Sequence, residues 1–198
     1  MDTHKLQRMM FSYSDGWQYL LYMRPGTGRL MWTYVVPMSL IPAVMFVYAM
    51  VLTPGKVLPA LSPQIAVAEA VTVALLFFLI EVGMVALMAA LIQQMGEVVE
   101  STPGYEESFV LAAVAPTPLW IGSLALLVPS LWFNMAVMVC AWLAAASLIY
   151  HGVFPVFRLE SRAQARMMGS FVLSAGVIAW AALLVVMALV LSMVIGLR

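Results

Sequence analysis

The chain has 198 residues, of which 65% are hydrophobic and only 9% are charged, and its formal net charge is zero. Because about a quarter of the residues in soluble globular proteins are charged, this composition excludes a soluble domain and predicts that lipid surrounds most of the chain. The zero net charge and the lack of a long basic run also exclude a nucleic-acid partner, which requires a basic surface.

The first 32 residues are predicted to form an interfacial segment ahead of the transmembrane region. Their longest strictly apolar stretch runs from Met9 to Phe11, which is shorter than the run of about 7–15 residues that a signal peptide needs. Aromatic and apolar residues alternate with Arg8 and Arg24, a pattern typical of a segment at the depth of the lipid headgroups. We expect this segment to lie on the inner leaflet, and an undocked tail is the alternative.

Five apolar runs follow, each long enough to cross a bilayer as a helix. They predict an all-α integral membrane protein, a bundle of five transmembrane helices formed by residues 33–198. The predicted spans are residues 33–52, 66–92, 108–129, 132–157 and 169–197. Only Pro129, Ser130 and Leu131 separate the third and fourth spans, so these two helices are expected to be antiparallel neighbours.

Basic residues are distributed unequally between the two ends of the predicted bundle. The end that carries the N-terminus has seven of the nine Lys and Arg residues: Lys5, Arg8, Arg24, Arg29, Arg158, Arg162 and Arg166. Cytoplasmic loops of membrane proteins carry such an excess. The distribution therefore predicts a cytoplasmic N-terminus and, with five spans, a C-terminus outside.

Arg158, Arg162 and Arg166 form a cytoplasmic basic patch between the fourth and fifth spans. On a single helix, their spacing of four residues would align them along one stripe. The predicted loop 93–107 on the same side contains four glutamates and no basic residue. The patch is interpreted as a solvated face, as a docking surface for that loop, or as a surface that attracts anionic lipid.

Glu81 lies in the middle of the second predicted span. An ionised carboxylate at the bilayer centre costs about 3 kcal/mol on insertion scales, so Glu81 is expected to be neutral or to face a water-filled cleft. By depth alone, its candidate hydrogen-bond partners are Thr117, Trp142, Ser147 and Trp180. Two interpretations stay open: a proton or cation site, and a neutral interhelical hydrogen bond that fixes packing.

Prolines are predicted to kink two of the spans. Pro37 and Pro42 fall in the first span, and Pro116 and Pro118 fall in the third. Each proline removes a backbone donor and frees a carbonyl that a neighbour or a ligand must satisfy. Broken helices at mid-depth build transport sites in some membrane proteins, but they also occur in membrane proteins with other functions.

The sequence contains no pattern typical of a catalytic or metal site. Glu69 lies twelve residues before Glu81, about 120° around a helix, which disfavours a site of paired carboxylates. The 17 methionines are interpreted as flexible apolar filling, because only His4 and His151 are present to complete a soft-metal site. Cys140 is a lone cysteine in an apolar span. We therefore predict no enzymatic activity, no metal and no cofactor.

Two motifs in the second half of the chain resemble a known family. The stretch Tyr105 to Pro118 reads Y-E-E-S-F-V-L-A-A-V-A-P-T-P, and Tyr150 to Pro155 reads Y-H-G-V-F-P after the short turn at Pro129. These motifs resemble the Yip1 family, and more closely its bacterial branch of small inner-membrane proteins. The resemblance covers about residues 102–196, with a weaker match at Arg24 and Pro25.

The resemblance implies a five-helix membrane protein with a cytoplasmic N-terminus in a bacterial inner membrane. The positions that match the family pattern are implied to be packing and helix-shaping positions: Tyr105, Ser108, Phe109, Pro118, Tyr150 and Gly152.

Two functions of different classes fit these observations. The leading hypothesis is a non-enzymatic scaffold or accessory subunit, whose partners are membrane lipid and either a second copy of the chain or another membrane protein. The alternative is a small transporter, channel or lipid-translocating protein that uses Glu81 at the membrane midplane.

Overall fold

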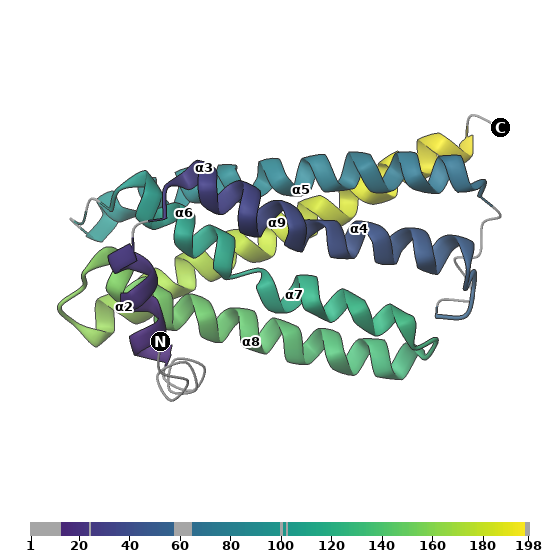
Figure 1. The fold of residues 1–198 in the computed structure, drawn as a ribbon. Helices are drawn as coiled ribbons and strands as arrows, with labels where there is room; N and C mark the ends of the chain where they lie inside the picture. Colours follow the sequence, from purple (N-terminus) through teal and green to yellow (C-terminus); the bar gives the residue numbers. More distant parts are fainter. Residues whose placement is uncertain (1–12, 24, 58–64, 100, 102, 197–198) are drawn as a thin grey trace, which may run out of the picture.

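The structure is a computed structural model that describes residues 13–23, 25–57, 65–99, 101 and 103–196. Within these residues all regular secondary structure is helical. Five helical segments are long and apolar enough to cross a membrane, which confirms the predicted fold class. They run alongside one another, and a short additional helix crosses one end of the bundle (Figure 1).

The first two spans are each continuous helices. The first span, Thr27–Val51, consists of α3 (Thr27–Leu30), a π-helical turn (Met31–Val35) and α4 (Val36–Val51). The second consists of α5 (Val67–Met95), followed by a 3₁₀ turn (Gly96–Val99).

The third span is broken and the last two are long single helices. The third comprises α6 (Tyr105–Val114), α7 (Thr117–Gly122) and a 3₁₀ turn (Ser123–Leu127). The fourth is α8 (Leu131–Phe157), which packs against α7 after the expected short turn, and the fifth is α9 (Arg162–Gly196).

Two observed spans begin well before their predicted starts. The first begins six residues earlier, at Thr27, and the fifth begins seven residues earlier, at Arg162. Both extensions contain arginine, Arg29 in the first and Arg162 and Arg166 in the fifth. An apolar run marks only the part of a helix that suits lipid, whereas backbone hydrogen bonds continue the helix into the polar residues beside it.

The segment before the first span forms α2 (Tyr13–Met23), which lies across one end of the bundle (Figure 1). α2 packs against α8 and α6, and its Trp17 is only 3% exposed. The interfacial location stays a prediction, and Arg8, Arg24 and the stretch from Met9 to Phe11 lie outside the described residues.

The main core lies at the same end of the bundle, around α6. Six consecutive residues of α6, from Ser108 to Ala113, are buried, because α6 is packed between α2, α5 and α8. Phe157 at the end of α8 and Met168 in α9 are also fully buried in this cluster. A smaller cluster joins α4 to α5 through Phe46 and Val73 and reaches the far half of α9.

The prolines affect the two predicted kink sites differently. Pro37 lies in the first turn of α4, and α4 continues through Pro42 without a break. The third span does break: α6 ends at Val114, and α7 begins at Thr117 with Pro118 in its first turn. Since proline has no N–H and clashes with the preceding turn, the paired prolines Pro116 and Pro118 end one helix and start another.

Candidate functional site

The candidate site is centred on a contact between α5 and α7. Glu81 is the fifteenth of the 29 residues of α5, and only 8% of its surface is exposed. Trp120, one turn after the break in the third span, is 2% exposed and donates its indole Nε1–H to Glu81 Oε1 at 2.8 Å. The break between α6 and α7 thus places an indole donor opposite the mid-membrane carboxyl group.

The second carboxyl oxygen of Glu81, Oε2, does not take part in the hydrogen bond to Trp120. Oε2 is buried and has no hydrogen-bond partner among the described residues. Leaving a buried polar atom unpaired costs about 1–3 kcal/mol. The Glu81 side chain is therefore held by one oxygen and retains hydrogen-bonding capacity at the other.

Glu81 lines a cavity of about 230 Å³ formed by residues from α5, α7, α8 and α9. Of the described residues in the lining, Glu81 is the one that carries a charged group, and most of the wall is apolar. Trp142 of α8 and Trp180 of α9 form part of the wall, with their rings edge to face at a centroid separation of 5.0 Å. Met84 and Met88, which follow Glu81 along α5, line the same cavity.

The cavity brings together some of the predicted polar residues and leaves others elsewhere. Trp142 and Trp180 share the lining with Glu81. Thr117 instead exchanges a hydrogen bond with the Tyr34 hydroxyl at 2.7 Å, and Ser147 lies 3.4 Å from His151 Nδ1. A polar intramembrane site that includes these residues and Glu81 stays a prediction.

Trp120 is a hydrogen-bond partner of Glu81 that depth in the membrane did not predict. Depth alone favoured Thr117 as the candidate partner from the third span. The break at Pro116 changes which residues face α5, so that Trp120 occupies that position. One signal was available in the sequence: Trp120 is the one tryptophan in the predicted third span, and a buried indole N–H needs an acceptor.

The cavity walls have no metal-binding character in the part of the chain that the structure describes. Among those residues, no group of three His, Cys, Asp or Glu side chains is positioned to hold a metal ion. Met84, Met88 and Met138 lie in the cavity wall, where flexible thioethers fill irregular space.

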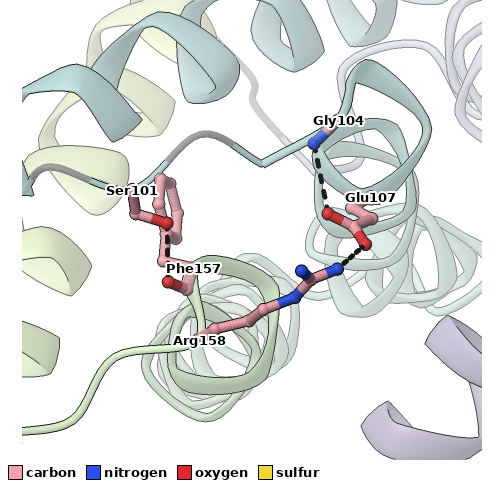
Figure 2. A network of polar contacts seen from close by, with 5 residues as sticks. All are labelled: Ser101, Gly104, Glu107, Phe157 and Arg158. Atoms are coloured by element: carbon pink, nitrogen blue, oxygen red, sulfur yellow. Dashed lines mark hydrogen bonds and ion pairs between the residues drawn. The ribbon is translucent and has the colours of Figure 1, made fainter.

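A second polar cluster lies at the end of the bundle near α2. Glu107 of α6 accepts a hydrogen bond from the Gly104 backbone N–H at 3.1 Å and forms an ion pair with Arg158 at 2.7 Å. Beside it, Ser101 donates to the Phe157 carbonyl at 2.7 Å (Figure 2). The Arg158 side chain is 72% exposed, so this ion pair contributes about 0–1 kcal/mol.

The three arginines of the basic patch do not lie on one helix. Arg158 follows the end of α8 in a left-handed conformation, with φ 50°, whereas Arg162 and Arg166 belong to the first turns of α9. A left-handed residue ends a helix, so the even spacing in sequence does not produce one face. Arg158 instead links the α8–α9 connection to the glutamate-containing segment at Glu107.

Comparison with known proteins gives one match. The family model described as the Yip1 domain matches residues 8–197. No curated protein and no solved structure matches the chain.

Proposed function

Because the chain belongs to the Yip1 domain family over nearly its whole length, we propose that it is a non-enzymatic scaffold or accessory subunit of a membrane. As an integral membrane protein with five apolar spans, it would associate with a second copy, another membrane protein or lipid. The proposal includes a bacterial inner membrane as its location, with the N-terminus cytoplasmic. Arg29, Arg158, Arg162 and Arg166, at the ends of spans nearest α2, support this orientation.

The observation that carries the scaffold proposal is the outward surface of α9. None of the residues in its most apolar 18-residue window is buried inside the protein, because α9 packs mainly against α5 and α8. Ile178, Val185, Leu189 and Met193 are all exposed large side chains, and their spacing places them on one face of the helix. We call this face the α9 stripe.

Such a face is suited to association within the bilayer. Lipid tails are as apolar as these side chains, so helix association there depends on close packing rather than on the hydrophobic effect. The exposed side chains of the α9 stripe are available for such packing. A second copy or another membrane helix would bind along the α9 stripe.

The proposal is tested by capturing tagged chain from its own membranes in a mild detergent and identifying bound proteins by mass spectrometry. Wild-type protein is expected to retain untagged copies or another membrane protein in fixed stoichiometry. Leu189→Trp should reduce that recovery at least about tenfold, because a clash of even 1.4 kcal/mol at an interface weakens binding tenfold. The measurement is the molar ratio of partner to tagged chain.

Leu79→Trp provides the matched control, since Leu79 of α5 is 62% exposed and Leu189 is 59% exposed. The control should retain the partner. Recovery of single copies with lipid alone from wild-type membranes would contradict the scaffold. Loss of the partner in Leu79→Trp but not in Leu189→Trp would move the interface from α9 to α5.

The Glu81 cavity favours a second candidate, a small transporter, channel or lipid-translocating protein. A carboxyl group at mid-depth beside a broken helix is an arrangement that some transporters use. Against an ion path, no other charged residue in the described part of the chain lines the cavity, and Glu81 Oε1 is already bonded to Trp120. This candidate requires a flux that depends on the Glu81 carboxyl group.

A further inference from the structure

We propose that the Glu81 cavity binds an uncharged lipid that carries a hydroxyl group, with that hydroxyl against Glu81 and the hydrocarbon part against the tryptophans and methionines. This inference goes beyond the scaffold function, because it assigns a ligand class to a site that association along α9 does not use.

The depth of Glu81 excludes an ordinary phospholipid headgroup from this position. Glu81 lies fourteen residues from either end of α5, which at 1.5 Å per residue is about 21 Å from each end of the helix. The hydrocarbon core of a bilayer is about 30 Å thick, so the carboxyl group is near its middle. A lipid that reaches it must have a polar group small enough to enter the hydrocarbon region.

The charge of the cavity lining further limits which lipid headgroup can bind there. Among the residues that the structure describes, no Lys, Arg or His lines the cavity, so a phosphate or carboxylate headgroup would be buried beside Glu81 without a counter-charge. An uncharged headgroup avoids that cost, which amounts to several kcal/mol for an unpaired ion. Anionic lipids are therefore disfavoured.

The unpaired oxygen favours a hydroxyl group as its partner. Glu81 Oε2 is buried without a partner among the described residues, although the Glu81 side chain lines the cavity. A hydroxyl group both donates and accepts hydrogen bonds. It therefore matches Oε2 whether the carboxyl group is ionised and acts as an acceptor or is protonated and acts as a donor.

The remaining wall suits a hydrocarbon chain. Trp142 and Trp180 offer large aromatic surfaces, and the unbranched side chains of Met84 and Met88 adapt to irregular shapes. The cavity volume of about 230 Å³ is several times the roughly 30 Å³ that one water occupies. A hydroxyl headgroup with its first methylenes fits there, and the rest of the chain would extend into the bilayer.

The binding test uses quenching of tryptophan fluorescence in phosphatidylcholine nanodiscs. Three of the six tryptophans, Trp120, Trp142 and Trp180, line the cavity. The probe is stearyl alcohol with two bromine atoms at mid-chain, because bromine quenches tryptophan at short range. We expect quenching that saturates with probe concentration and that unbrominated stearyl alcohol reverses. Octadecane, which has the same chain without the hydroxyl group, should compete about tenfold less well, because it leaves Glu81 Oε2 without a hydrogen-bond partner.

Two glycines provide a matched pair of variants that test the location. Gly176 of α9 lines the cavity, and Gly83 of α5 is not in the lining. At both positions an added Cβ would meet nothing within 4 Å, so either has room for the first side-chain carbon, and replacing glycine also improves helix propensity. Gly176→Leu should weaken probe binding about tenfold or more, and Gly83→Leu should leave it unchanged.

Glu81→Leu should abolish the preference for the alcohol over octadecane, whereas Glu81→Gln should keep it. Because Glu81→Leu can fail to fold, the glycine pair and the octadecane comparison test the proposal without it. Quenching that rises linearly without saturation, equal competition by octadecane, equal binding in the two glycine variants, or equal quenching by a phosphatidylcholine brominated at mid-chain would each overturn it. None of these results bears on partner capture, so failure here leaves the scaffold proposal standing.

Discussion

Trp120→Ala is expected to lower the free energy of unfolding by about 3–5 kcal/mol, the usual range for removing a buried tryptophan. Trp120 is 2% exposed and supplies the hydrogen bond to Glu81 Oε1. Its removal enlarges the cavity between α5 and α7 and leaves both carboxyl oxygens of Glu81 without a protein donor. Unfolding in mixed micelles, followed by circular dichroism, measures the change.

A second substitution separates the hydrogen bond from the packing. Trp120→Phe retains an aromatic ring but lacks the N–H, so it should cost about 1–3 kcal/mol for the unpaired carboxyl oxygen, in addition to the smaller ring. When Glu81 is first replaced with leucine, the hydrogen-bond part of that cost should disappear. An equal cost of Trp120→Phe with Glu81 and with Leu at position 81 would show that the 2.8 Å contact contributes nothing.

Gly152→Ala is expected to detach α2 from the bundle and to destabilise the protein by about 1–3 kcal/mol, a typical cost of overpacking a core. A Cβ at Gly152 would lie 2.6 Å from Trp17 Cζ2 and 2.7 Å from Leu111 Cδ1. Trp17 is buried and its rigid ring cannot fold away, so α2 must move. Hydrogen exchange of the backbone amides of Tyr13–Met23 should become faster.

Gly83→Ala is the control for this experiment, because a Cβ at Gly83 meets nothing within 4 Å. That variant should be as stable as the wild type or slightly more stable, given the higher helix propensity of alanine. Wild-type exchange rates for α2 in Gly152→Ala would mean that the Trp17 contact does not hold α2 against α8.

Much of the architecture could be predicted because membrane spans depend on simple properties. A run of about 20 apolar residues is long enough to cross a bilayer in helical form, and this rule predicted five spans that the structure confirms. Pro116 and Pro118 predicted the break in the third span, and the short turn at Pro129 predicted the pairing of α7 with α8. Each of these features depends on a short stretch of residues, so it can be predicted from the sequence.

The features that could not be predicted depend on where helices end in the folded protein and on which way their side chains face. Depth alone ranked Thr117 as a partner of Glu81, but the break before α7 turns Trp120 toward α5. The i, i+4, i+8 spacing of Arg158, Arg162 and Arg166 would form a stripe only on a single helix, and a left-handed residue at Arg158 separates α8 from α9. Pro42 was expected to interrupt the first span, but α4 continues through it.

We propose that this protein is a membrane scaffold in which Glu81 serves packing and ligand contact rather than ion movement. The most direct measurement is proton flux into liposomes that contain wild-type protein, the Glu81→Gln variant or no protein, at several pH values. The account predicts that all three preparations have the same flux, while the wild type and the variant retain the same partner on capture. A pH-dependent flux in wild-type liposomes that Glu81→Gln abolishes without loss of assembly would contradict it and establish the transporter.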